Sequence, residues 1–325
     1  MHSPILSAFG AAVHIAALCI SSLSFAEPLD IVAYSITLDP SDPGRTQFDA
    51  LQWRGGFELH SSNAQFGGLS ALEFPDATDR FVALSDLGFR IDGRLIEVQN
   101  RPIAFIETTI APLQNRHGGR LGDIWRDAES LAADGAGGVF VAFEGQHRVL
   151  HYPAPSAGTA RLLETPQEMQ RLPRNEGIEA MTRLCDGRLL LIAEHPDATG
   201  HVPAWAGNGT DGAWTPLRYP VSDEFVPTGA ATLPDCRIAV LERRFSLLGG
   251  FAARIRRLDL IPDAERDLTP VTLARIAPPM LTDNFEAIAT RRSASGETLL
   301  YILSDDNYIS LERTLLLVFA LPPAD

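Results

Sequence analysis

An internal repeat is the sequence feature that most constrains how this chain can fold. Five stretches share one pattern: a small or acidic residue, a short apolar run, a turn rich in Asp, Gly or Pro, and a second apolar run ending on an acid. The small or acidic residues that serve as anchors of the repeat are Gly68, Glu129, Glu179, Gly229 and Glu286, which are 61, 50, 50 and 57 residues apart. Each stretch reads as a β-hairpin, and repeats of this length indicate stacked units or blades. The repeat therefore predicts a β-propeller.

The segments between the hairpins can supply the outer strands of the blades. Apolar runs at 93–99, 147–153, 253–260 and 269–277 lie between the hairpins, and a four-stranded blade requires such further strands. To close the ring, the terminal runs 30–39, 55–61 and 314–322 would have to share a blade. We therefore expect an all-β propeller with five or six four-stranded blades, the sixth being one that the termini could assemble.

The first 26 residues have the features of a signal peptide. They contain no Lys, Arg, Asp or Glu, and an apolar stretch from Ala8 to Leu23 is followed by Ser24-Phe25-Ala26, with small residues where signal peptidase requires them. We expect cleavage before Glu27 and a periplasmic or secreted protein, residues 27–325 forming one domain. The segment lacks a basic residue at its start, so an uncleaved anchor is the alternative, although the apolar run is short for a membrane-spanning helix.

The amino-acid composition argues against a nucleic-acid partner. The chain has 41 acidic and 27 basic residues, a net charge of −14, and every basic residue is Arg. No basic stripe with interleaved aromatic residues is present, so we expect no nucleic-acid partner. We expect a monomer that acts on a small molecule and does not associate with a membrane after cleavage.

The repeat also predicts a ring of acids. In a hairpin, the first strand begins where the second ends, and in a propeller these two strands lie nearest the channel. The ring would contain Glu129, Glu179 and Glu286 from strand starts, and Asp86, Glu144, Glu194, Glu242 and Asp305 from strand ends. Crowded carboxylates raise each other's pKa unless a cation or Arg neutralises them. Oxygen ligands favour Ca²⁺ over Zn²⁺, and the alternative is that each acid is a solvated turn residue.

Several stretches resemble the phytase-like domain of exported bacterial proteins, the family described as having the esterase-like activity of phytase. The similarity covers about residues 66–321 and is strongest at 126–145, 175–195, 239–245, 284–292 and 300–321. It implies a propeller that hydrolyses phosphate or other esters, and Ca²⁺ as the cofactor. No G-x-S-x-G, H-E-x-x-H or P-loop motif is present, so the chemistry would depend on a metal.

The resemblance also implies individual site residues. Those matching its motifs are Asp127, Glu129, Glu144, Asn175, Glu179, Glu242, Arg243, Asn284, Glu286, Asp305, Asp306 and Asn307. This sequence departs from the family at Ser130, where Gly is usual, and at Gly229, where an acid is common. One ligand is thus expected to be missing, which leaves open a scaffold that has lost catalysis.

The ring and the resemblance together give the expected site. The metal ligands are Glu129, Glu144, Glu179, Glu242, Glu286, Asp305 and Asp306. The catalytic residues are Glu129, Glu179, Arg243 and His195, with Arg243 binding a phosphoryl or ester oxygen and His195 acting as general acid or base. Other candidates facing the mouth are Arg90, Arg126, Arg244 and His147, and each Arg has pairing with a nearby acid as its alternative.

Three functions remain open at this point. The first is a metal-dependent ester or phosphoester hydrolase, the second is a propeller that binds a ligand or partner without catalysis, and the third is a lactonase-like metal hydrolase. Propellers commonly serve as binding platforms, and the missing acid at Gly229 favours the second.

The two cysteines outside the first 26 residues occupy equivalent positions. Cys185 and Cys236 stand in the hairpin turns of consecutive repeats, on the face opposite the predicted acidic mouth. Export would place them in an oxidising compartment, so we expect a disulfide, with two free thiols as the alternative.

Overall fold

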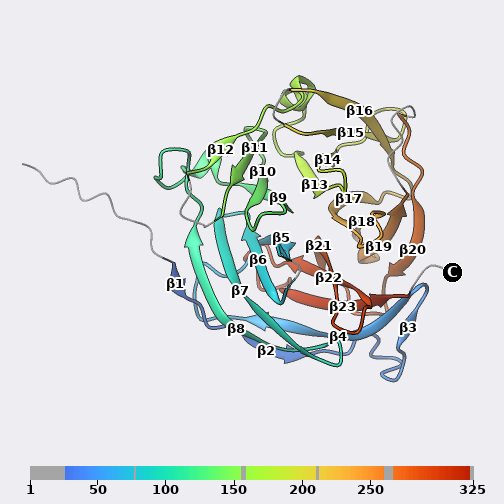
Figure 1. Cartoon of the computed structure of the whole chain (residues 1–325). Helices are drawn as coiled ribbons and strands as arrows, with labels where there is room; N and C mark the ends of the chain where they lie inside the picture. The colour runs from blue at the N-terminus through green and yellow to red at the C-terminus, as the bar shows by residue number, and fades with distance from the viewer. Residues whose placement is uncertain (1–25, 77, 155–158, 210–211, 260–265, 323–325) are drawn as a thin grey trace, which may run out of the picture.

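The computed structural model describes residues 26–76, 78–154, 159–209, 212–259 and 266–322. Apart from Ala26, the predicted signal peptide lies outside these residues. Five antiparallel sheets stand around a central axis, so the chain is a five-bladed β-propeller (Figure 1). The strands nearest the axis are β5, β9, β13, β17 and β21, whose bounds are given below.

Each blade is built outwards from the axis. The first has β5 (Leu69–Glu73), β6 (Arg80–Ser85), β7 (Phe89–Val98), β8 (Arg101–Pro112) and the short β1 (Glu27–Pro28). The second has β9 (Ala128–Ala133), β10 (Val139–Phe143), β11 (Arg148–Tyr152) and β12 (Arg161–Leu162). The third has β13 (Ile178–Arg183), β14 (Leu189–Ala193), β15 (His201–Gly207) and β16 (Trp214–Pro220). The fourth has β17 (Val226–Thr232), β18 (Ile238–Ser246), β19 (Gly250–Leu258) and β20 (Val271–Ile276).

The fifth blade joins the two ends of the chain. Its order is β21 (Asn284–Arg292), β22 (Thr298–Asp305), β23 (Leu315–Leu321), β4 (Leu51–His60) and β2 (Val32–Ser35), with β3 (Gln47–Phe48) paired to β4. The predicted sharing of one blade by the terminal runs is confirmed. The described residues form no sixth blade, because β4 pairs with β23 and the N-terminal strands are used up in completing the fifth.

The core lies between the blades. Strand β23 reads as an unbroken apolar run because both of its faces are covered: Leu317 and Phe319 pack towards the fourth blade, while Leu316 and Val318 pack towards the first. Helical structure in the described residues is limited to two 3-10 turns, η1 (Asp123–Trp125) and η2 (Gln167–Arg171). Neither is long enough to cross a bilayer.

A disulfide joins the third and fourth blades. Cys185 lies in the turn after β13 and Cys236 in the turn after β17, and their Cα atoms are 5.6 Å apart. The structure thus forms the bond expected from the equivalent positions of the two residues. Adjacent hairpin turns approach closely enough because the inner strands of neighbouring blades converge on the axis.

We expect alkylation of the unfolded, unreduced protein to label no thiol in residues 27–325. Reduction should lower the melting temperature, because the bond closes a loop with a sequence separation of 51 and such loops contribute about 4 kcal/mol in the chain-entropy model. Two labelled thiols per chain would show that the bond does not form.

Candidate functional site

Every inner strand carries a β-bulge at the same level of the propeller. The pairing shifts by one residue in all five hairpins, and the residues at the shift are Ser70, Glu129, Glu179, Thr228 and Glu286. A bulge turns a side chain away from the regular alternation of the strand. Three of the five positions are acids, and they correspond to the predicted strand-start acids.

The bulge position of the first and fourth blades carries a hydroxyl group instead. Ser70 donates a hydrogen bond of 2.5 Å to the carbonyl of Ala128, and Thr228 donates one of 3.0 Å to the carbonyl of Phe285. Each hydroxyl thus bonds to the inner strand of the next blade. The expected anchors Gly68 and Gly229 were wrong: the equivalent residues are Ser70 and Thr228.

The small residue that follows each bulge is a signal that could have given the correct alignment. These residues are Ala71, Ser130, Ala180, Gly229 and Ala287. At Gly229, a Cβ atom would lie 3.1 Å from the backbone of Glu286 and of Ile288 on the neighbouring inner strand. The inner strands approach too closely here for a large side chain.

The second strand of each hairpin also contributes one residue at the same level. In each hairpin, this residue faces the inner-strand residue that lies two places before the bulge. The facing residues are four acids and one Arg, namely Asp86, Glu144, Glu194, Arg243 and Asp305. Four of the predicted strand-end acids therefore occupy equivalent positions. In the fourth blade that position belongs to Arg243.

Glu242 does not belong to the ring, and its prediction as a metal ligand is not supported by its surroundings. It lies one residue before the ring position, and a shift of one residue turns a strand side chain to the opposite face. Its fully buried carboxylate accepts a 2.8 Å hydrogen bond from the hydroxyl of Tyr219 and pairs with Arg254 and Arg256. This network stands between the third and fourth blades.

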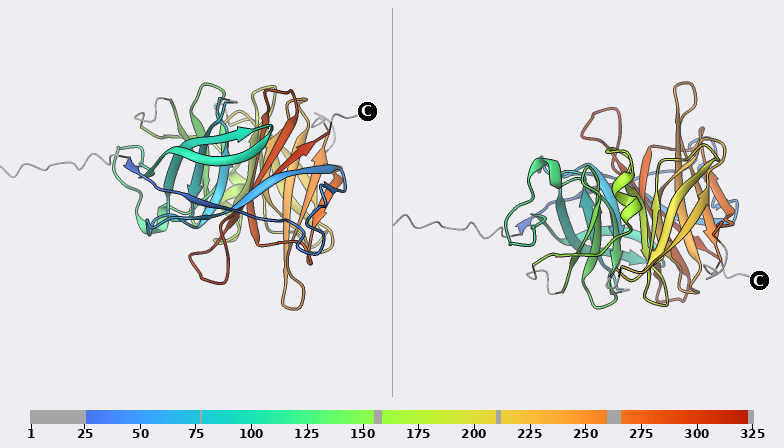
Figure 2. Two further views of the ribbon diagram at one scale, coloured as in Figure 1. Left: turned by 90° about the horizontal axis from the view of Figure 1, so that it is seen from below. Right: turned by 90° about the horizontal axis from the view of Figure 1, so that it is seen from above.

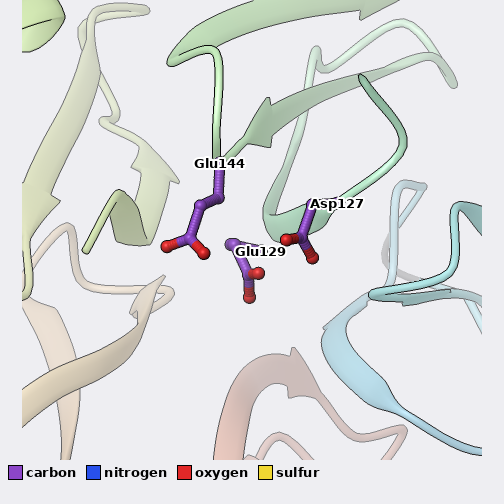
Figure 3. A group of neighbouring side chains, drawn as sticks. All are labelled: Asp127, Glu129 and Glu144. Carbon is purple, nitrogen blue, oxygen red and sulfur yellow. The ribbon is translucent and has the colours of Figure 1, made fainter. Parts of the chain in front are cut away.

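Two carboxylates of the ring and that of Asp127 converge at the second blade. One oxygen each from Asp127, Glu129 and Glu144 lies within 4.8 Å of the other two (Figure 3). Burial, together with Glu179 and Asp127, raises the pKa of Glu129 well above its usual value. Burial and Asp127 raise the pKa of Glu144 to about 7. Carboxylates crowded in this way are stabilised either by protonation or by a nearby cation.

Arg243 neutralises the acids on the opposite side of the ring. Its guanidinium donates to Glu286 at 2.6 Å, to Glu194 at 3.1 Å and to the side-chain oxygen of Asn284. Burial still raises the pKa of Glu286 to about 7. Glu179 lies between the two halves, is 8% exposed, and has its pKa raised by burial and by Glu194 and Glu286.

The two adjacent carboxylates after β22 have different surroundings. Asp305 is buried at the mouth, and burial raises its pKa to about 8. Asp306 uses both oxygens within the protein: it accepts from the backbone of Gly68 at 2.9 Å and of Tyr308 at 3.1 Å, and from the hydroxyl of Thr314 at 3.0 Å. Asp306 thus ties the last loop to the first blade, which leaves it poorly placed to serve as a ligand.

Asp86 completes the ring between Asp305 and Asp127. One of its oxygens is buried and has no hydrogen-bond partner among the described residues. Burial, with Asp127 as a further cause, raises its pKa to about 6. An unpartnered carboxylate oxygen at this position is a second group to which a cation could bind.

The remaining predicted residues are spread around the rim. The imidazole of His195 is 52% exposed and contacts the carboxylate of Glu176, a residue that no motif in the sequence indicates. His147 is buried and bonded to the carbonyl of Pro173 at 3.0 Å. The other candidate Arg residues also have partners. Arg90 forms an ion pair with Asp92, Arg126 forms one with Asp123, and the guanidinium of Arg244 lies over the aromatic ring of Phe225.

A hollow of about 590 Å³ opens beside the carboxylate cluster. Its lining includes Asp127, Gly145, Arg174, Asn175 and Glu176. Asn307, by contrast, is exposed and bonds to Glu312 at 2.7 Å, so it does not take part in the cluster. The hollow gives a small molecule access to Asp127.

The sequence profile of the Phytase-like family, described as "Esterase-like activity of phytase", matches residues 64–308. The chain belongs to this family. None of the curated proteins matches it. Among solved structures, it is similar to U3-55K, with a TM-score of 0.42, 9% identity, and coverage of 81% of this chain and 98% of that one.

This phytase-like chain is also similar to two further solved structures. A glucose dehydrogenase matches with a TM-score of 0.40 and 14% identity, over 85% of this chain and 90% of that one. A putative gluconolactonase matches with a TM-score of 0.38 and 13% identity, over 90% of this chain and 94% of that one.

The raised pKa values predict how stability depends on pH when no metal ion is bound. Glu144, Glu286 and Asp305 have folded-state pKa values of about 7, 7 and 8, above their ordinary values of 4.5, 4.5 and 3.8. The folded state therefore binds more protons than the unfolded state in this range, so stability is lost as pH rises. In EDTA, the melting temperature should fall between pH 5 and pH 8, and less steeply in Glu144→Gln. A melting temperature that stays constant or rises over this range would contradict raised pKa values for these carboxyl groups.

Proposed function

We propose that this protein is an exported, calcium-dependent hydrolase of carboxyl or phosphate esters, with its site at the acidic mouth of the propeller. The observation that carries the proposal is the convergence of Asp127, Glu129 and Glu144 beside a hollow open to solvent. Membership of the Phytase-like family supports hydrolysis of an ester. The substrate would be a small molecule, because the hollow has a volume of about 590 Å³.

The geometry of the cluster suits a calcium ion. Ca²⁺ binds oxygen at 2.3–2.6 Å, so two ligand atoms of one ion can be no more than about 5 Å apart. The three carboxylates meet that limit with oxygens within 4.8 Å of one another. Among the described residues, none of the three forms an ion pair with Arg or His, unlike Glu194 and Glu286. A donor set made only of oxygen atoms suits Ca²⁺ better than Zn²⁺, which prefers His and Cys ligands.

The residues of the chain would have different roles in hydrolysis. A bound ion would supply Lewis acidity to the ester oxygen and to an attacking water. Arg243 keeps Glu194 and Glu286 in place and offsets their charge, so we assign it a positioning role in place of the expected direct contact with substrate. His195, which is exposed and paired with Glu176, a residue that lines the hollow, would carry a proton between the mouth and solvent.

Export has support of its own. The Cys185–Cys236 disulfide is the kind of bond that persists in an oxidising compartment such as the periplasm or the extracellular space. The signal peptide expected in the first 26 residues would take the chain there.

Calcium should raise the melting temperature by mass action on the folded state. Glu129→Gln should reduce that shift strongly, because it removes a ligand charge and keeps the shape of the side chain. Glu242→Gln is the matched control: it should lower stability by about 3 kcal/mol or more by breaking a buried ion pair, yet keep the calcium-dependent shift. Equal melting temperatures in EDTA and in millimolar Ca²⁺ would refute a stabilising site.

Hydrolysis is tested with p-nitrophenyl phosphate and p-nitrophenyl carboxyl esters, with and without Ca²⁺. Glu129→Gln and Asp305→Asn should each lower turnover by roughly tenfold or more, as losses at metal sites usually do. Wild-type turnover in both variants would place the site elsewhere. Calcium binding without turnover on any ester, gluconolactone included, would identify a ligand-binding propeller.

A further inference from the structure

A second hollow lies at the outer strands of the third blade, apart from the carboxylate cluster. It has a volume of about 680 Å³, and none of the residues that line it lines the hollow beside Asp127. Its lining comes mainly from β15, β16 and η2 and from the segment that precedes η2. Figure 2 shows η2 beside the strands of the third blade, as Figure 1 does. The hollow is therefore separate from the site of the proposed hydrolysis.

Two tryptophans on one face of the third sheet line this hollow. Trp205 on β15 pairs with Pro216 on β16, and both line it. In the same two strands, Gly207 pairs with Trp214. Because side chains alternate along a strand, these four residues lie on the same face of the sheet. That face is turned towards the second blade, since both indoles pack with the core cluster that contains Ala142 of β10.

The indole of Trp214 is fixed in position. A Cβ atom on Gly207 would lie 2.6 Å from one of its ring atoms, so the indole lies directly on this glycine. Its N–H donates a 2.9 Å hydrogen bond to the carbonyl of Glu164, in the segment that precedes η2. The ring is only partly buried, and it lines the hollow. A ring held in this way loses little freedom when a ligand binds to it.

Trp205 has a hydrogen-bond donor without a partner. It is 4% exposed and lines the hollow, and no described residue accepts a hydrogen bond from its indole N–H. A buried indole N–H usually has an acceptor. A ligand that carries a hydroxyl group would provide one.

The charge of the hollow is negative. Glu164 and Glu168 line it, and its lining contains no Arg or His. Neither carboxylate forms an ion pair with a described residue. Arg171 and Arg218 line an adjoining hollow of about 380 Å³, which shares Glu168 with the first, and Arg218 pairs there with Asp267. The larger hollow therefore favours a cation and disfavours an anion.

We propose that this hollow binds a small organic cation, a quaternary or protonated amine that carries a hydroxyl group. The face of an indole attracts such a cation, and Trp does so more strongly than Tyr or Phe. The carboxylates of Glu164 and Glu168 add an attraction that a neutral ligand does not gain. The hydroxyl group accepts the hydrogen bond of Trp205. Binding here is independent of the proposed ester hydrolysis, because the two hollows share no lining residue.

The test compares choline with 3,3-dimethylbutan-1-ol, which has the same shape and hydroxyl group but a carbon atom in place of the charged nitrogen. Choline should bind the full chain about tenfold more tightly or better, as measured by calorimetry, because only the charged compound is attracted by the indoles and the carboxylates. The double variant Glu164→Gln/Glu168→Gln should reduce this ratio to about threefold or less. Its melting temperature should stay unchanged, since both side chains are exposed. Asp30→Asn/Glu224→Gln changes the net charge equally at two exposed acids that do not line the hollow, and it should keep the ratio.

Each other outcome would overturn the proposal. Equal affinity for choline and its neutral analogue would show that the hollow does not select a cation. A preference for choline that persists in the double glutamine variant would place the cation elsewhere, for example at the acidic mouth. Binding of glucose without binding of choline would identify a sugar site. Failure of choline to bind at millimolar concentration would refute the site and leave the proposed hydrolysis untouched.

Discussion

The close packing of five inner strands around one axis is the constraint on which the site depends. Each inner strand touches both of its neighbours, and only small side chains such as Ala180 and Gly229 fit where they meet. The bulge just before each of these residues brings the side chains of Glu129, Glu179 and Glu286 to one level. Carboxylates are thereby held near one another with little water, and their raised pKa values express the cost of that proximity.

The charge of the crowded carboxylates is neutralised by an Arg on one side of the ring and not on the other. On one side, Arg243 takes the fourth blade's place in the ring and pairs with Glu194 and Glu286. On the other side, no described Arg or His pairs with Asp127, Glu129 or Glu144. Arg243 therefore divides the described ring into a half whose carboxylates pair with an Arg and a half whose carboxylates have no Arg or His partner among the described residues. The asymmetry of the ring, more than its total charge, locates the candidate site.

The sequence was sufficient for the fold and for most of the ring. The hairpin repeat gave the blades, and the terminal apolar runs gave the closure, because both depend on local pattern. Glu242 was misassigned because a bulge changes which residue of a strand faces the mouth, and alternation alone does not reveal a bulge. The link from Asp306 to the first blade could not be predicted, because its partner, the backbone of Gly68, lies 238 residues away in the sequence. The number of blades stayed open between five and six, since strand pairing between chain ends is a long-range contact.

The pairing of β4 with β23 also bears on how the molecule is made. The strand at Leu51–His60 is synthesised early and must wait for Leu315–Leu321, almost at the end of the chain, before its partner exists. Until then the fifth blade has no outer half, and the first and fourth blades each lack a neighbour on one side. Contacts of such sequence separation form slowly. A chain that crosses a membrane unfolded and completes its ring only on the far side would meet this requirement without exposing a half-closed propeller on the way.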